Sequence, residues 1–286
     1  MREREVREIV TPTAASDGAG VRLRRSIATP RLDNLDPFFL FDHFGSENAD
    51  DYIAGFPMHP HRGIETITYV LDGSVAHRDS LGNSGVVGPG DVQWMTAGSG
   101  ILHEEMPKAG PRRLDGFQVW VNLPRKLKMT APRYQDVPAA RIPELTRSDG
   151  SRIRIVAGEV DGTKGAVSEI YADPTWLDVA LPAGASFEQR VPLGHTGLLY
   201  VFEGEVTVGG SAAGKTVPAV RLAILTDGDV VRVRADSAPA RFLLLSAQPL
   251  DEPAVRYGPF VMNTREEIEQ ALRELRDGTF VKPAGK

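Results

Sequence analysis

The chain has 286 residues, of which 41% are hydrophobic and 25% are charged, and its formal net charge is −5 at pH 7. These values are typical of a globular protein with an ordinary core, and a net negative charge gives no electrostatic reason to expect nucleic-acid binding. The sequence contains no cysteine, which excludes disulfides, thiolate metal sites and a cysteine nucleophile.

The N-terminal segment alternates charged and apolar residues and lacks the apolar stretch of a secretory signal. No run of apolar residues approaches the roughly 18 that a membrane span requires. We therefore expect a cytoplasmic protein that has neither a membrane nor a nucleic acid as a direct partner.

Short apolar runs rich in β-branched and aromatic residues recur along the chain, and glycine and proline separate them. Runs of this length between turn signals such as Asp-Gly and Pro-Gly-Asp predict strands of an antiparallel barrel or sandwich. The clearest examples are residues 66–71, 92–95, 117–123, 198–202, 230–233 and 242–245.

The two halves of the chain resemble each other weakly. The segment 69–75 (YVLDGSV) is similar to 200–206 (YVFEGEV), and a Gly-Asp turn before a strand follows each, at 90–91 and at 228–229. Similarity of this kind indicates an internal duplication, so we expect two similar β-domains.

The junction between these domains is expected near residues 135–150, where Pro138 and Pro143 interrupt the strand pattern. We therefore predict one domain over residues 1–135 and a second over residues 136–286.

One helix is predicted near the C-terminus. Thr264 is a plausible N-cap, and Glu267 three residues later completes a capping-box pattern. An apolar stripe then follows at helical spacing, and Gly278 ends it. The stripe consists of Ile268, Leu272 and Leu275.

Two pairs of potential metal ligands stand out, His59 with His61 and His103 with Glu105. Residues i and i+2 of a β-strand point to the same face, so each pair can direct two ligand atoms toward one point. If the pairs lie on facing strands, three imidazoles and one carboxylate suit Fe(II), Ni, Zn, Cu or Mn. Four protein ligands on an octahedral metal leave two positions for a substrate or O₂. The alternative is a solvated loop and an unrelated histidine beside an acidic turn.

Several longer strings of this sequence resemble the pirin family of the cupin superfamily, and together they cover nearly the whole chain. The matching strings are PFFLFDHF at 37–44, GFP at 55–57, HPHRG at 59–63, GD at 90–91, QWMTAG at 93–98, GILH at 100–103, EMP at 105–107, Gln118, WVNL at 120–123 and YGPFVMNT at 257–264.

This resemblance implies an all-β bicupin, with two antiparallel jelly-roll β-barrels face to face and a C-terminal helix. It also implies one metal ion in the N-terminal barrel, most often iron, with His59, His61, His103 and Glu105 as the ligands. Fe(II) is therefore expected first, with Ni, Cu, Mn and Zn as alternatives.

The resemblance implies two classes of function. Some bacterial members are similar to flavonol dioxygenases, which open quercetin-like rings with O₂, and in that case Glu105 is the expected catalytic base. Other members act as protein partners, including transcriptional co-regulators. We expect the dioxygenase, acting on a small aromatic enol, and keep the regulatory metalloprotein as the alternative. The ligand set cannot separate the two because both use the same site.

The second half lacks the ligand pattern, because His195 stands alone there. A lone histidine is usually a hydrogen-bonded structural residue, so we expect no metal in the C-terminal domain. Glu104 and Glu105 could be read as paired carboxylates for hydrolysis, but adjacent strand residues face opposite sides.

Other candidate site residues have structural alternatives. Glu65 shares strand parity with His59 and His61 and is expected close to the site, where it would orient a ligand. His77 is expected either to line the cavity or to be a hydrogen-bonded strand residue. Asp42 and His43 would close the barrel mouth or pack a loop. An apolar and aromatic face near the ligands suits a flat substrate, although such a face is usually core; its members are Phe56, Met95, Gln118, Trp120 and Asn122.

Overall fold

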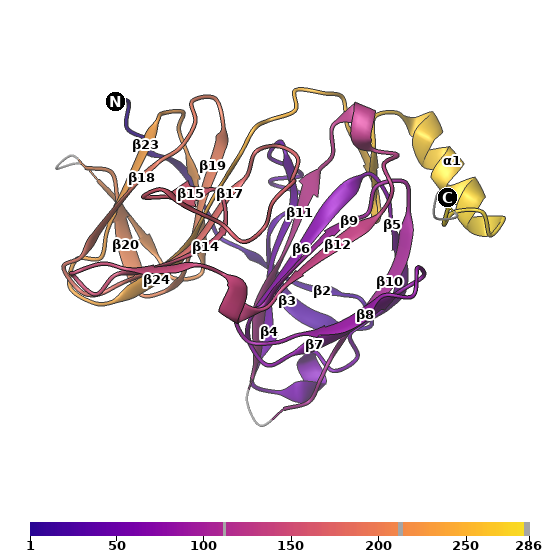
Figure 1. Cartoon of the computed structure of the whole chain (residues 1–286), viewed down its shortest axis with the longest axis horizontal. Coiled ribbons are helices and arrows are strands. Elements are labelled where there is room, and N and C mark those ends of the chain that lie inside the picture. Colours follow the sequence, from indigo (N-terminus) through magenta and orange to yellow (C-terminus); the bar gives the residue numbers. More distant parts are fainter. Residues whose placement is uncertain (111–112, 211–213, 283–286) are drawn as a thin grey trace. The chain divides into compact units, whose positions relative to one another are not determined.

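The computed structural model describes residues 1–110, 113–210 and 214–282. Strands dominate these residues, and α1 (Arg265–Arg276) is the one α-helix among them (Figure 1, yellow). No helix in the described part of the chain is both long enough and apolar enough to cross a membrane. The predicted all-β class and the C-terminal helix are both confirmed.

The chain forms two compact units, described here as the first and second barrels. The first barrel comprises residues 13–139 and the segment that begins at Leu250, and the second comprises residues 1–12 and 140–249. The expected domains, 1–135 and 136–286, were continuous halves, so the observed units differ from them mainly at the two ends of the chain. At the N-terminal end the difference arises because β1 (Val6–Val10) is hydrogen-bonded to β22 (Arg221–Leu225) of the second barrel. At the C-terminal end it arises because the segment after Leu250 is bonded to the first barrel, where the Val261 N–H donates to the Arg62 carbonyl oxygen.

The first barrel is built from a seven-stranded sheet in the order β12-β9-β6-β11-β4-β3-β2 and a four-stranded sheet in the order β5-β10-β7-β8. Its strands are β2 (Thr13–Asp17), β3 (Val21–Ile27), β4 (Phe38–Ser46), β5 (Phe56–His61), β6 (Ile64–Asp72), β7 (Val75–Asp79), β8 (Ser84–Val87), β9 (Val92–Thr96), β10 (Ile101–Pro107), β11 (Leu114–Asn122) and β12 (Arg133–Val137), with the later hairpin β25 (Val255–Tyr257) and β26 (Phe260–Met262).

The second barrel repeats this plan, with a seven-stranded sheet in the order β1-β22-β19-β24-β17-β14-β13 and a four-stranded sheet in the order β18-β23-β20-β21. The repeat agrees with the internal duplication seen in the sequence. Its remaining strands are β13 (Glu144–Thr146), β14 (Arg152–Ala157), β15 (Glu159–Val160), β16 (Thr163–Lys164), β17 (Thr175–Leu181), β18 (Ser186–Arg190), β19 (Thr196–Glu203), β20 (Glu205–Val208), β21 (Lys215–Pro218), β23 (Val230–Arg234) and β24 (Ala240–Ala247).

The helix α1 begins where the sequence predicted. The Thr264 side chain accepts a hydrogen bond from the Glu267 backbone N–H, and the Glu267 side chain accepts one from the Thr264 backbone, which completes the capping box. The helix ends at Arg276, two residues before Gly278, and Ile268 and Ala271 are its buried residues.

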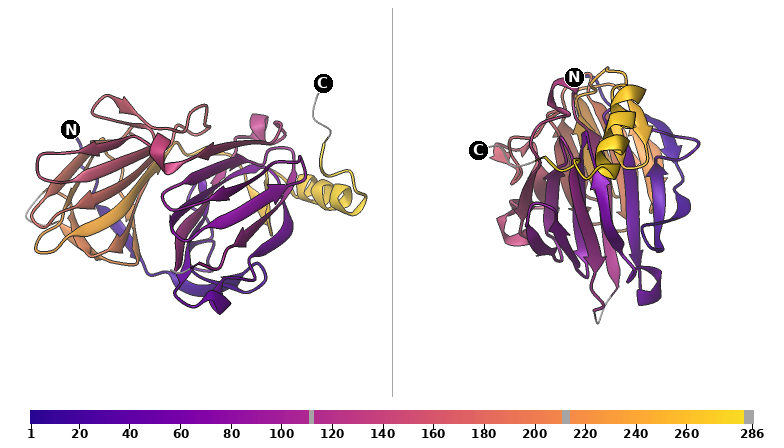
Figure 2. Two further views of the ribbon diagram at one scale, coloured as in Figure 1. Left: turned by 60° about the horizontal axis from the view of Figure 1, so that its bottom comes forward. Right: turned by 90° about the vertical axis from the view of Figure 1, so that its right-hand side faces the viewer.

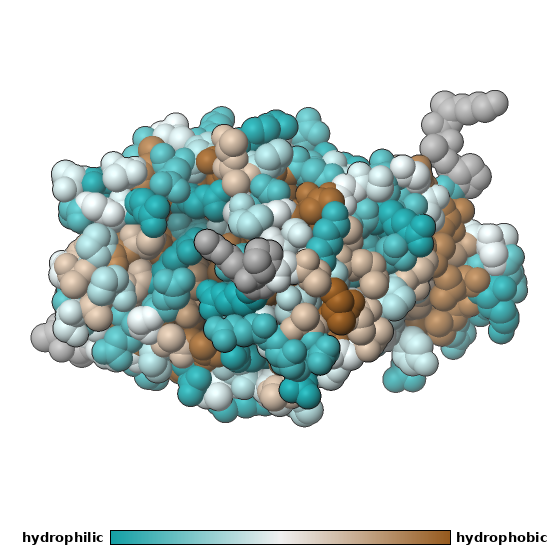
Figure 3. Space-filling view, turned by 90° about the horizontal axis from the view of Figure 1, so that it is seen from below, coloured by the Kyte–Doolittle hydropathy of each residue, from teal (hydrophilic) through white to brown (hydrophobic). Residues whose placement is uncertain are grey.

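The interiors of the two barrels differ in polarity. The second barrel is filled by one apolar cluster that includes Phe187, Phe242 and Leu244. In the first barrel, histidines and polar side chains occupy part of the interior, among them His61, His103, Thr68 and Glu105, all of which are buried. Figure 2 shows the strands of both barrels from two further directions. On the face shown in Figure 3, hydrophilic and hydrophobic residues are interspersed.

Candidate metal centre

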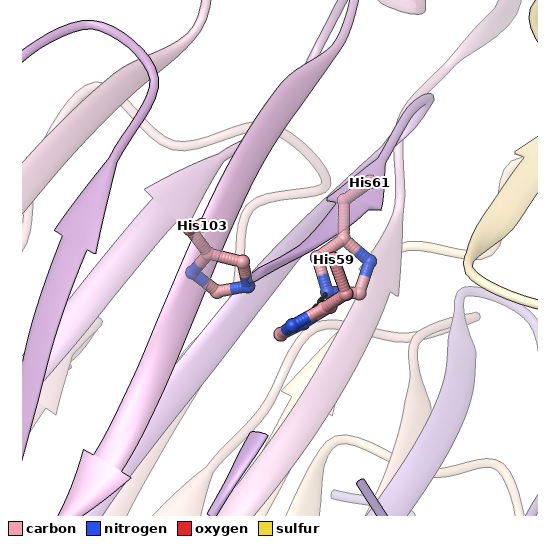
Figure 4. A group of neighbouring side chains, drawn as sticks. All are labelled: His59, His61 and His103. Carbon is pink, nitrogen blue, oxygen red and sulfur yellow. Dashed lines mark hydrogen bonds between the residues drawn. The ribbon is translucent and has the colours of Figure 1, made fainter. Parts of the chain in front are cut away.

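Three histidines of the first barrel converge on one point. His59 and His61 lie on β5 and His103 lies on β10, and their rings approach one another in Figure 4. One ring nitrogen from each histidine lies within 4.8 Å of the others, and the two Nε2 atoms of His59 and His61 are 3.0 Å apart. The strands β5 and β10 are hydrogen-bonded neighbours in one sheet, with His103 opposite His59. The two candidate pairs therefore lie on neighbouring strands of one sheet, and not on the facing strands considered from the sequence.

Each of the three rings can offer one nitrogen with the free lone pair that a metal ion requires. Within the described residues, neither nitrogen of His103 has a hydrogen-bond partner although both are buried. The Nδ1 atoms of His59 and His61 lie 3.0 and 3.3 Å from the carbonyl oxygens of Pro57 and Pro259. These carbonyls place the proton on Nδ1, which leaves both Nε2 atoms free to bind a cation. The three residues therefore fit a metal ion.

Burial keeps two of these rings uncharged. Loss of hydration, together with the neighbouring His59, lowers the pKa of His61 well below its ordinary value. Burial and the other two histidines lower the pKa of His103 in the same direction. Both rings are therefore neutral at pH 7, which is the form that coordinates metals.

Glu105 lies at the edge of the histidine cluster. Its Oε2 atom is 4.0 Å from His103 Nε2. Thr68 Oγ1 donates to Oε1 at 2.8 Å and Gln118 Nε2 donates to Oε2 at 3.0 Å, and both donors lie on the opposite sheet. Glu104 points away from this interior and binds Arg78 at the surface. The two adjacent carboxylates therefore face opposite sides, as their strand positions predicted.

A cavity of about 440 Å³ adjoins the cluster. Its lining includes His59, His61 and Glu105, so a molecule in the cavity can reach the histidines directly. The rest of the lining is mainly apolar. The principal apolar residues are Leu23, Leu40, Phe44, Phe56 and Trp120.

Two family models match this chain, Pirin over residues 20–121 and the Pirin C-terminal cupin domain over residues 176–281. The chain belongs to the pirin family. A Pseudomonas aeruginosa protein provisionally named quercetin 2,3-dioxygenase is 48% identical over 98% of this chain and 99% of its own length. Mouse pirin is 45% identical over 92% of this chain and 89% of its own length.

Solved structures agree with this assignment. The crystal structure of a quercetin 2,3-dioxygenase from Acinetobacter baumannii superposes with a TM-score of 0.87 and 35% sequence identity. The match covers 97% of this pirin-family chain and 98% of that chain. The predicted bicupin class is thereby confirmed.

Some secondary candidates lie at the cavity of this pirin-family chain and others do not. Phe56, Gln118, Trp120 and Asp42 line it. The prediction for Glu65 was wrong, because its carboxylate accepts a hydrogen bond from Thr96 and does not line the cavity. That prediction assumed that side chains alternate without a break from His59 to Glu65. The turn at Gly63, which has a φ of +80°, separates β5 from β6 and breaks this alternation.

The remaining candidates make other contacts. His43 Nε2 lies 2.8 Å from Asp115 Oδ1, and His77 stacks on Tyr134 with the ring centroids 5.7 Å apart. Asn122 accepts from Lys128. Met95 belongs to an apolar cluster. In the second barrel, His195 Nδ1 lies 3.3 Å from Ser246 Oγ.

The segment that follows Leu250 packs against β5, the strand that carries His59 and His61, and this role was not predicted from the sequence. Besides Pro259, the backbone N–H of Val261 donates to the Arg62 carbonyl. The Arg62 guanidinium donates to Glu274 of α1 at 2.6 Å and lies 4.4 Å from the Phe280 ring centre. These contacts join residues about two hundred positions apart, and no local pattern in the sequence reports them.

Proposed function

We propose that this chain is a metal-dependent dioxygenase that acts on flavonol-like, quercetin-type enols. It would bind a single divalent metal ion, for which Fe(II) is the leading candidate. The ligands would be His59, His61, His103 and Glu105. The observation that carries the proposal is the cluster of three imidazoles, two of them buried, beside a cavity with aromatic walls. The provisional quercetin dioxygenase name of the relative from Pseudomonas aeruginosa supports the same chemistry.

The bound metal would supply Lewis-acid polarisation of the substrate hydroxyl and a template for O₂. Glu105 is the group that accepts the hydroxyl proton, at a carboxylate oxygen on the edge of the cluster. Thr68 and Gln118 restrain this carboxylate, because each donates a hydrogen bond to it. Such restraint holds the proton acceptor in place before the substrate arrives.

The cavity walls bind and orient the substrate. Phe56 and Trp120 offer flat apolar surface to an aromatic ring system, and filling the cavity expels water from around Glu105. Trp120 also contacts His61 edge-on with the ring centroids 5.0 Å apart, which restrains that imidazole.

The proposal is tested by oxygen consumption and loss of flavonol absorbance, on protein loaded in turn with Fe(II), Ni, Cu, Mn or Zn. We expect turnover with at least one metal. We expect turnover to disappear in His61→Ala and to persist in His195→Ala, a matched control because His195 is also buried but lies in the other barrel.

A fully metallated protein that consumes no O₂ with any flavonol or catechol would contradict the enzymatic proposal. It would favour the alternative, a metal-binding regulatory protein that docks a protein partner without catalysis.

A further inference from the structure

The cavity beside the histidines contains two arginines in very different states. Arg25 donates two hydrogen bonds to Asp42, at 2.8 and 2.6 Å, and one to Asp17 at 2.7 Å. Burial opposes its charge, but these two carboxylates more than compensate and raise the pKa of Arg25. Its side chain is therefore already engaged by the protein.

Arg256, on β25, lines the same cavity and is not engaged in this way. Within the described part of the chain it makes one hydrogen bond, from Nη1 to the Phe39 carbonyl oxygen at 3.2 Å. Among the described residues no carboxylate lies within the 4.0 Å of an ion pair, although Asp33, Asp42 and Asp17 act on its charge from farther away. A guanidinium carries five N–H donors, so most of its donors remain available.

Partial burial makes this state costly for the free protein. Loss of hydration lowers the pKa of Arg256 from its ordinary value. Arginine side chains in proteins nevertheless stay protonated. A half-buried cation without a direct counter-ion is stabilised strongly by a carboxylate that arrives with a ligand. Planar guanidinium and carboxylate groups also match in shape, because two parallel N–H···O bonds can form.

The cavity therefore offers three kinds of contact to one molecule. Two of the histidines and Glu105 line the part that could accept a metal-binding oxygen of a ligand. The apolar wall, which includes Leu40 and Phe56, could contact an aromatic ring, and Arg256 could bind an anionic group. Asp17 and Asp42 form ion pairs with Arg25 and make no hydrogen bond with Arg256 in the described part of the chain.

We propose that Arg256 binds a carboxylate of the substrate, so that the preferred substrates are aromatic enols or catechols that carry an acidic group. This inference rests on the proposed function, because the metal centre supplies the contact to the reacting hydroxyl. It narrows the substrate class of the dioxygenase from neutral flavonol-like enols to anionic ones.

The test is binding without turnover. Dissociation constants for catechol and for protocatechuate, which is catechol with a carboxylate, are measured by calorimetry on Fe(II)-loaded protein in the absence of O₂. We expect the wild type to prefer protocatechuate by about tenfold or more, the effect of one hydrogen bond to a charged group. Arg256→Gln should abolish this preference. Arg256→Lys keeps the positive charge but lacks the two parallel N–H donors of the guanidinium, so it should retain only part of the preference.

Arg24→Gln is the charge-matched control, because Arg24 is exposed on β3 and does not line the cavity; it should keep the preference. Melting temperatures establish that all variants are folded. An equal affinity for the two ligands in the wild type, an unchanged preference in Arg256→Gln, or binding of neither ligand would overturn the inference. Because no O₂ is present, the preference can hold even if the protein proves to have no dioxygenase activity, so the two failures are distinguishable.

Discussion

The carboxyl group of Glu65 is fully buried on β6 and accepts a hydrogen bond from Thr96 Oγ1 at 2.7 Å. Burial raises its pKa from 4.5 to about 7, although the hydrogen bond from Thr96 opposes this shift. Between these two pH values the folded state holds more protons than the unfolded state. The stabilisation contributed by Glu65 is therefore fully present below pH 4.5 and is lost as the pH rises through about 7.

Glu65→Gln should remove this pH dependence. We expect the free energy of unfolding of the variant, relative to wild type, to increase by about 2–3 kcal/mol between pH 4 and pH 8. Urea unfolding of both proteins at several pH values measures the difference, and contributions from the histidines cancel in it. A difference that is constant with pH would show that Glu65 titrates normally.

The alternation of side chains along a β-strand predicted which residues share a face within one strand, but it could not be extended across a turn. His103 and Glu105 share a face of β10 while Glu104 faces outward, as alternation along one strand requires. For Glu65 the same argument crossed the turn at Gly63 and failed. Arg256 and Pro259 could not be predicted, because only the tertiary fold brings them to the cavity of the first barrel.

At the scale of elements, the connection between β5 and β6 depends on Gly63. A Cβ atom at this position would lie 2.1 Å from the Val261 carbonyl oxygen, and φ is +80°. Lys128 Nζ donates to the carbonyl oxygens of both Gly63 and Val261, at 2.9 and 2.7 Å. The close approach therefore fixes the segment after Leu250 against the strand that carries His59 and His61.

Gly63→Ala should destabilise the protein and weaken metal binding, whereas Gly82→Ala should have the smaller effect. Gly82 has a similar φ of +88° but nothing within 4 Å of its Cβ position, so it controls for backbone strain alone. We expect Gly63→Ala to cost about 2 kcal/mol more in the free energy of unfolding than Gly82→Ala. Urea unfolding measures the cost, and equal losses would refute a role for the contact with Val261.

Elements with strong local signals were predictable from the sequence. The apolar runs at 66–71, 92–95 and 242–245 lie in β6, β9 and β24, and the capping box marks the start of α1. The pairing of β1 with β22 was not predictable, because it joins residues more than two hundred positions apart. Pairing at that distance leaves no periodic pattern in the sequence.

At the scale of the whole molecule, duplication gave two barrels with equivalent sheets and different interiors. The strand orders of the seven- and four-stranded sheets correspond between the barrels. The interior of the second barrel is one apolar cluster, whereas the first combines buried histidines with a cavity. This difference was visible in the sequence, because both pairs of candidate ligands lie in the first half of the chain.

Whether the first barrel binds a metal ion is tested by the metal content of the purified chain after loading with Fe(II) or Zn and removal of excess ion, measured by native mass spectrometry. We expect one ion per chain in the wild type and in His195→Ala, and none in His103→Ala, with all three proteins folded. Full occupancy in His103→Ala, or an ion lost only in His195→Ala, would contradict the assignment of the metal centre to the first barrel.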